Sequence, residues 1–402
     1  LGGKIEDDYG FSSLALFYSY DGENFETEEV SFNPATVDQS YYHIFKLDTA
    51  KVKAGAELTY YMQVSDNDGV NGYKSSKSAA YTFKIPSKEE LEEDIERSSQ
   101  AIQQSIDNTL KEAEELNRKI QQADERLKTK KEMDWQDEKL MQEILEQKEK
   151  LANKVEELKK ENRLNNQKLD QFNPQSEEIK QKMEQLQEIM NNVLDEETKK
   201  LYDELRQLLE EQSDIEEFRE KMEELQQNSG NLEEDLERTL ELFKKLQFEM
   251  TLDETLEQLD EAIQDQQQLQ KETEESSKTE EELAQEQKQE KEDIDKLKEQ
   301  IDKLNEINKN RKNPDDLPKD AREQLEEIQQ DQQDAQDALE MDEKNSEDGQ
   351  SPQQRAVKSQ QRAGEKMQQL KQSLESVQSN MQMEQQMENM DNLRDLVDNL
   401  VT

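Results

Sequence analysis

The stretch AAYTFKIPSKEEL, residues 79–91, contains the transition on which the fold depends. Up to Ile85, apolar and other residues alternate with the period of a half-buried β-strand. Pro86 then interrupts the strand, and residues 87–90 (SKEE) match a capping box, in which the Ser hydroxyl and the last Glu carboxylate each bind a backbone amide of a first helical turn. The sequence therefore predicts a β region before this point and helices after it.

Similar alternating runs occur earlier in the chain, separated by turn residues such as Asp21-Gly22 and Asn33-Pro34. The apolar positions of three runs are Leu14, Leu16, Tyr18 and Tyr20, then Leu58, Tyr60, Met62 and Val64, and finally Ala79, Tyr81, Phe83 and Ile85. Several short strands at this spacing predict a small antiparallel sandwich of immunoglobulin or fibronectin type over residues 1–86. Because the pattern begins almost at Leu1, we expect that a first strand is missing and that the chain is a piece of a longer protein.

An oxygen-rich loop, DNDGVNG at residues 66–72, provides the weak calcium candidates Asp66, Asp68 and Asn71. Its spacing does not fit an EF-hand, because the fifth position is Val70 and the twelfth is Lys77. Asp, Asn and Gly are also the residues that tight turns require. We therefore interpret the loop as a turn between strands and keep calcium binding as an alternative.

The composition argues against a single globular core. Of the 402 residues, 30% are hydrophobic and 38% are charged, and the formal net charge is -47. A compact domain is richer in apolar residues, whereas narrow helical seams need far fewer of them. Such a negative charge repels phosphate groups, so we expect no nucleic-acid binding. No stretch approaches the roughly 18 to 20 apolar residues of a membrane span, so we expect no direct membrane insertion.

Residues 87–173 have the most regular helical pattern. A heptad seam passes through Met141, Ile144, Leu151, Val155, Leu158 and Leu169, and a seam of matching length precedes it. Two such helices joined by a few polar residues predict an antiparallel coiled-coil hairpin with its tip near residues 130–134, where Asp134 caps the second helix. Pairing between two chains, which would make a homo-oligomer, is left open.

Beyond Pro174 the pattern predicts shorter helices that form a bundle over residues 174–312 and C-terminal helices over residues 313–402. We expect Gly230 to end one helix and a capping box at Thr251 to begin another. The apolar seam nearly disappears over residues 264–290, which predicts a helix that is polar all round or frayed. Residues 341–352 are acidic and rich in turn formers, and are expected to be a flexible loop.

Several segments together resemble a family of large membrane-anchored envelope proteins from the Bacteroidota that has no established activity. They are EDDYGF at residues 6–11, SDNDGVNGYK at 65–74, IPS at 85–87, LERTLELFKKL at 236–246 and LRDLVDNL at 393–400. The resemblance implies transmembrane helices upstream, further helices downstream, a periplasmic location and other envelope proteins as partners. It supplies no catalytic residues.

Function is expected to be structural. The chain has no nucleophile motif, glycine-rich phosphate loop or metal-ligand spacing, so we assign no catalytic and no cofactor-binding residues. Repetitive charge on a helical rod distinguishes partners poorly, whereas aromatic residues and methionines provide specific contacts. Tyr73, Met387 and Met390 are therefore the partner-binding candidates of a periplasmic scaffold. For the methionine-rich run at residues 381–390, a face that simply packs in the helical bundle is the favoured alternative. The alternatives are a calcium- or ligand-binding head on a coiled-coil stalk and a cytosolic coiled-coil tether.

Overall fold

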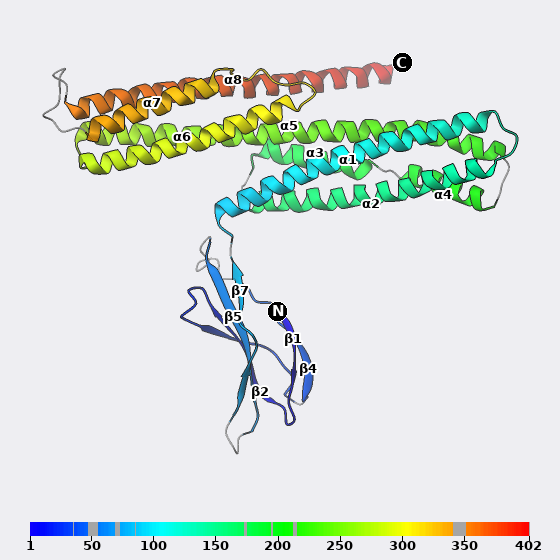
Figure 1. Cartoon of the computed structure of the whole chain (residues 1–402), viewed down its shortest axis with the longest axis horizontal. Helices are drawn as coiled ribbons and strands as arrows, with labels where there is room; N and C mark the ends of the chain where they lie inside the picture. Colours follow the sequence, from blue (N-terminus) through cyan, green and yellow to red (C-terminus); the bar gives the residue numbers. More distant parts are fainter. Residues whose placement is uncertain are drawn as a thin grey trace. The chain divides into compact units, whose positions relative to one another are not determined.

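The computed structural model describes residues 1–34, 36–46, 55–68, 73–84, 86–172, 175–193, 196–211, 215–340 and 351–401. It is mostly helical with a small N-terminal β region of two sheets, as the sequence predicts (Figure 1). Two compact units are present: Leu1–Ala101 with Gln167–Pro174, and Ile102–Asn166 with Gln175–Thr402. The domain boundaries expected at residues 86, 173 and 312 stay predictions.

Seven strands make up the described part of the β region. They are β1 (Gly2–Glu6), β2 (Phe11–Ser19), β3 (Glu26–Glu29), β4 (Asp38–Tyr42), β5 (Glu57–Asp66), β6 (Ser75–Lys77) and β7 (Tyr81–Lys84). β1 pairs with β4 in a two-stranded sheet, and the other sheet has the order β3-β2-β5-β6, with β7 also paired to β5. All of these pairings are antiparallel.

The two sheets contribute to one apolar core because the predicted alternation holds along β2 and β5. Leu14 and Leu16 are buried and lie opposite Val64 and Met62 in the register of the two strands. Ile5 of β1 belongs to the same core cluster, so the small sheet also faces it. The alternation fails at β7, where all residues are exposed. The prediction that Tyr81 and Phe83 lie on a half-buried face is therefore wrong. Ile85 lies outside the described residues.

Eight helices follow in the described residues. They are α1 (Lys88–Lys128), α2 (Trp135–Phe172), α3 (Glu177–Asn192), α4 (Glu196–Glu210), α5 (Ile215–Glu275), α6 (Glu280–Lys309), α7 (Ala321–Glu340) and α8 (Pro352–Val401). The capping box before α1 is confirmed: the Ser87 amide donates to Glu90 Oε2 at 3.0 Å, and the Glu90 amide donates to Ser87 Oγ at 3.2 Å. Asp134 caps α2 as predicted, because its Oδ1 accepts from the amides of Gln136 and Asp137.

Ion pairs between α1 and α2 show that the two helices run antiparallel. Asp94 lies 2.6 Å from Lys168 near one end, and Arg126 lies 2.9 Å from Asp137 near the turn. Glu112 pairs with Lys154 between them. Residue numbers rise along one helix as they fall along the other, which places the turn at residues 129–134. The supercoiled packing of a coiled coil stays a prediction.

The first core of the helical unit is built by α1, α2, α4 and the beginning of α5, with Val193 after the end of α3. Its buried members include Ile120, Leu127, Ile144, Leu151, Tyr202, Leu205, Phe218, Met222, Leu225, Leu232 and Leu236. Ser229 Oγ donates to Asn117 Oδ1 at 2.9 Å, and Asn117 Nδ2 donates to Glu233 at 2.8 Å, so polar contacts join α5 to α1 beside this core.

α5 continues unbroken through both positions at which the sequence predicts a helix end. Gly230 is exposed and inside the helix, where glycine costs about 1 kcal/mol relative to alanine. Burial of Leu225 and Leu232 on either side of it outweighs that cost. Thr251 is also internal, and its carbonyl accepts from Thr255 Oγ1 at 2.6 Å. The predicted helix boundaries at Gly230 and Thr251 are therefore wrong.

The second core is shared by the later part of α5 with α6, α7 and α8, which lie alongside one another (Figure 1). It includes Phe248, Leu252, Leu259, Ile294, Leu297, Ile301, Leu304, Leu325, Ile328, Met367, Leu370 and Leu374. The predicted interruption at Asn313-Pro314 and Pro318 is confirmed, because α6 ends at Lys309 and α7 begins at Ala321. Residues 341–350 of the expected loop lie outside the described residues, and α8 starts at Pro352.

Residues 264–290 contain a buried polar layer, whereas their composition predicts a helix that is polar all round or frayed. Each of the helices α5 to α8 contributes one fully buried glutamine: Gln266, Gln287, Gln332 and Gln360. Gln287 and Gln332 donate to Gln266 Oε1 at 3.3 and 3.0 Å, and Gln360 donates to Gln287 Oε1 at 3.0 Å. The prediction is wrong because amide hydrogen bonds replace the apolar contacts that a hydrophobicity pattern detects.

Cysteine crosslinking tests the antiparallel order of α1 and α2, since the chain has no native cysteine. We expect Glu112→Cys with Lys154→Cys, and Asp94→Cys with Lys168→Cys, to be joined by a short bismaleimide within one chain at low protein concentration. The mismatched pair Asp94→Cys with Lys154→Cys should not react, because 14 residues along α2 correspond to about 20 Å. Crosslinks found only between chains would contradict this arrangement.

Substitution of Gln266 tests the polar layer. Gln266→Ala leaves the amides of Gln287 and Gln332 without an acceptor, so we expect it to lower the free energy of unfolding by about 1–3 kcal/mol. Gln268→Ala is the control, because this exposed residue contacts only Glu272 of its own helix and should change stability by less than about 0.5 kcal/mol. Urea denaturation followed by circular dichroism measures both, and equal effects would contradict the role given to the layer.

Candidate partner-binding surfaces

Methionine side chains are exposed along one face near the end of α8. Met383, Met387 and Met390 have 54%, 65% and 70% of their surface exposed, and their spacing of four and three residues places them on the same side of the helix. Met381 is 4% exposed and belongs to the second core, on the opposite side. The structure therefore places the two predicted methionines, with Met383, in a stripe that faces away from the packed side of α8.

The end of α8 is still attached to the helical unit where this stripe begins. Gln378 Nε2 donates to Asp253 of α5, and Gln382 Nε2 donates to Glu178 of α3 at 3.2 Å. The backbone continues as helix to Val401, while the side chains of residues 391–401 are not described. The methionine stripe is thus positioned by a helix whose preceding turns are packed.

Tyr73, the partner-binding candidate in the head, is 68% exposed. It follows the 66–72 loop, of which residues 69–72 lie outside the described residues, so Asn71 cannot be placed. Asp66 Oδ1 accepts from the amide of Lys74 at 2.8 Å and from that of Asp68 at 3.4 Å. These bonds are those of a turn closing the β5–β6 connection, and calcium binding there stays a prediction.

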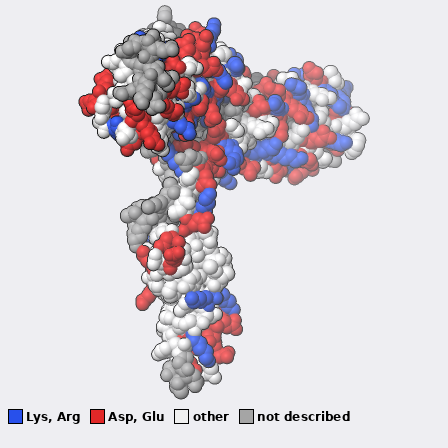
Figure 2. All heavy atoms as spheres, turned by 60° about the vertical axis from the view of Figure 1, so that its left-hand side comes forward, with Lys and Arg blue, Asp and Glu red and all other residues white. Residues whose placement is uncertain are grey.

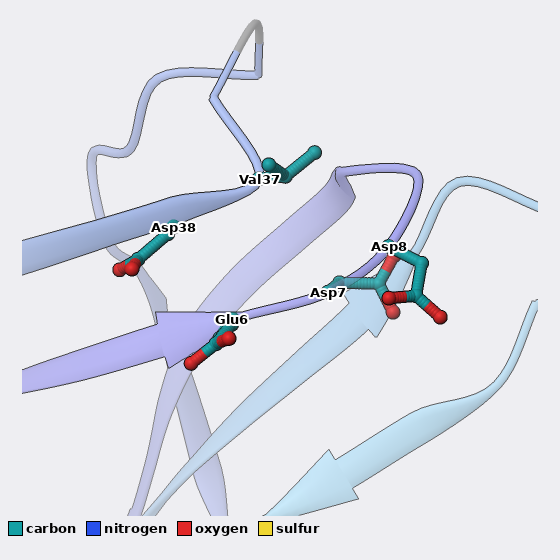
Figure 3. Close-up of a pocket in the computed structure, with 5 residues that line it drawn as sticks. All are labelled: Glu6, Asp7, Asp8, Val37 and Asp38. Atoms are coloured by element: carbon teal, nitrogen blue, oxygen red, sulfur yellow. The ribbon is translucent and has the colours of Figure 1, made fainter.

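An open depression of about 440 Å³ in the head was not anticipated from the sequence. It is lined by Glu6, Asp7, Asp8, Val37 and Asp38, which come from the ends of β1 and β4 and the loop after β1 (Figure 3). Glu6 and Asp38 are directly opposite each other in the strand register. Like charges in such a pair repel, and Lys4 offsets the repulsion by lying 2.9 Å from Asp38 and 3.8 Å from Glu6.

The loop that forms one side of this depression is held by its own hydrogen bonds. Asp7 Oδ2 accepts from the amides of Tyr9 and Gly10 at 3.0 and 3.1 Å, and Gly10 adopts a positive φ of 106° that favours glycine. The EDDYGF motif at residues 6–11 therefore forms a tight turn between β1 and β2. In the sequence analysis this motif served only as part of the resemblance to envelope proteins. The spacing of its Asp and Gly residues also indicates a turn, which could have been predicted.

Charged side chains of both signs cover the helices. On the face shown in Figure 2, Lys and Arg lie among Asp and Glu over the helical part, whereas uncharged residues are more frequent in the β region. Many of the basic residues form ion pairs, such as Lys366 with Asp331 at 3.0 Å and Lys182 with Glu249 at 2.8 Å. In the part of the chain that the structure describes, no group of three or more potential ligands among His, Cys, Asp and Glu could hold a metal ion.

Glu290 of α6 is the acidic residue whose titration is most changed by its surroundings. Burial, together with the nearby carboxylates of Asp265, Asp293 and Glu286, raises its pKa from 4.5 to about 8, and burial is the largest cause. Its protonated form is therefore favoured in the folded chain over a wide pH range.

Comparison with protein-family models, with curated proteins and with solved structures finds no match to this chain. Among the described residues, no helix is both long and apolar enough to cross a membrane. The resemblance to Bacteroidota envelope proteins therefore stays a prediction from the sequence.

Glu290→Gln tests the raised pKa. The folded chain keeps the Glu290 proton up to about pH 8 while the unfolded chain loses it near 4.5, so this group makes the wild-type protein less stable as the pH rises between these values. The variant should lack this loss and be more stable at pH 8 by about 1–2 kcal/mol, a value reduced for the partial exposure of the side chain. Denaturation at several pH values measures the difference, which should become smaller towards pH 5; a constant difference would contradict the assignment.

Proposed function

We propose that this chain is a non-catalytic scaffold module of a membrane-anchored envelope protein in the periplasm, where it holds other envelope proteins at a fixed spacing. The observation that carries the proposal is the methionine stripe of Met383, Met387 and Met390, which follows directly after packed turns of the same helix. Methionine is flexible and polarizable, and exposed apolar side chains at regular helical spacing suit the binding of a partner helix.

The helical body supports the spacing role. α5 alone has 61 residues, which correspond to about 90 Å at the rise of an α-helix. Buried cores occur along much of its length, so the helix is held by tertiary contacts and not by its own propensity alone. A long element that is packed in this way keeps its two ends apart.

Two finer features of the fold belong to the same proposal. The head is an immunoglobulin- or fibronectin-type sandwich, which is supported by two antiparallel sheets that share the core of Ile5, Leu14 and Met62. α1 and α2 form a coiled-coil hairpin, which is supported by their antiparallel ion pairs and by the buried seam of Ile144 and Leu151.

Capture of partners from solubilised envelope of the source organism tests the function. With the full chain as bait, Met387→Gln combined with Met390→Gln should reduce recovery of the captured proteins about tenfold, as loss of hot-spot contacts does. The exposed position Glu157 on α2 supplies the control, and Glu157→Lys should leave recovery unchanged. The scaffold assignment fails if Glu157→Lys abolishes capture while the methionine variant and Tyr73→Ser both capture normally.

A further inference from the structure

The outer edge of β1 presents backbone groups that have no partner in the described residues. Leu1 pairs with His43 through two hydrogen bonds of 2.8 Å, and the Asp7 amide donates to Val37 at 2.8 Å. In an antiparallel ladder the bonded residues alternate, so odd-numbered residues of β1 bond to β4. The N–H and C=O groups of Gly2, Lys4 and Glu6 therefore point away from β4, and all three residues are exposed.

Beside this edge, the core of the head is incompletely covered. Tyr81 and Phe83 of β7 lie opposite Tyr60 and Leu58 of β5, and Leu58 is 3% exposed. Tyr81 and Phe83 thus belong to the face of the sheet that is buried farther along β5, yet they are 55% and 51% exposed. Their exposure shows that the two-stranded sheet does not extend over β7.

Tyr41 links the two features. A Cβ atom at Gly3 would lie 2.6 Å from the Tyr41 hydroxyl, so the Tyr41 ring reaches from β4 over β1, and a larger residue at this position would require the ring to move. Burial raises the pKa of Tyr41, and the charge of Tyr81 acts in the same direction. Tyr41 and Tyr60 both pack against the core of the head, and the Tyr60 ring stacks on the Tyr81 ring with 5.7 Å between their centroids, so the exposed aromatic side chains of β7 continue the same core surface.

We infer that the head accepts an extended segment of another protein as an additional strand along the outer edge of β1. Backbone bonds would be made to Gly2, Lys4 and Glu6, and apolar side chains at alternate positions of the incoming strand would cover Tyr81 and Phe83. This surface is separate from Tyr73 and from the methionine stripe, so it goes beyond the scaffold function proposed above.

The charged residues around β1 indicate which side chains the incoming strand should carry. Lys4 is already paired with Asp38 and Glu6, so the middle of the edge offers no free charge and suits an uncharged strand. The acidic depression of Glu6, Asp7, Asp8 and Asp38 lies at the C-terminal end of β1 (Figure 3). A basic residue at the end of the incoming strand would lie beside these carboxylates. The partner segment is thus an apolar strand with a lysine or arginine at its end.

Hydrogen exchange of the full chain with the peptide Lys-Thr-Val-Thr-Val-Thr-Val-Lys tests the inference. At millimolar peptide, the amides of Lys4 and Glu6 should exchange at least tenfold more slowly, and the same peptide with alternate backbone N-methyl groups should have no effect. No slowing at β1, equal slowing by the methylated peptide, or slowing confined to another strand would each overturn the proposal. So would slowing that appears without peptide as the chain concentration rises, because the occupant would then be a second copy.

Two substitutions at one position separate the backbone contact from the charge. Lys4→Pro removes an outward N–H but keeps the bonds of β1 to β4, and should weaken peptide binding at least tenfold. Lys4→Ala removes the ion pairs but keeps the N–H, and should bind the peptide normally. Tyr81→Ser combined with Phe83→Ser should also weaken binding. Slow exchange at Leu14 and Leu16 shows that each variant is folded, and equal peptide binding by Lys4→Pro and Lys4→Ala would overturn the proposal.

Discussion

The unbroken course of α5 is the constraint on which the helical unit depends. Phe218, Met222 and Leu225 at its beginning lie in the core shared with α1, α2 and α4, while Leu252 and Leu259 lie in the core shared with α6 to α8. Because one helix contributes to both cores, neither set of helices can slide along α5 without losing buried contacts. The exposed glycine at position 230 is tolerated within this helix because the packing on either side of it is worth more than its helix propensity costs.

The glutamine layer makes the arrangement of the last four helices specific. Apolar seams are compatible with several registers, but buried amides need partners at defined positions, and leaving one unpaired costs about 1–3 kcal/mol. Gln266 and Gln287 each accept hydrogen bonds from two helices, and Gln360 also donates to Thr273 at 3.2 Å. A shift of α5, α6 or α8 would break at least two of these bonds, and a shift of α7 would break the bond from Gln332 to Gln266. Polar residues in this core therefore contribute more to the choice of register than to stability.

Exposed large apolar side chains in the described part of the chain include the methionine stripe of α8 and the aromatic side chains of β7. Exposed ion pairs along the helices are individually weak and similar to one another, so they supply solubility and little discrimination. The methionine stripe of α8 and the aromatic side chains of β7 are different, because each combines exposed apolar groups with a regular backbone. The two surfaces also offer different recognition: a helix face in one case and a strand edge in the other.

The sequence by itself determined the change from strands to helices at Pro86 and the caps at Ser87 and Asp134, because these depend on local hydrogen bonding. The exposure of Met387 and Met390 was decided by the tertiary structure, since a methionine-rich helical face can equally pack in a bundle. Only the tertiary structure decided that α5 continues past Gly230 and Thr251, since buried neighbours override local helix-ending signals. It also brought four glutamines from distant segments into one layer, which no hydrophobicity pattern can indicate. The exposed side of β7 and the free edge of β1 depend on how far the opposite sheet extends, a property of strand pairing between residues far apart in the chain.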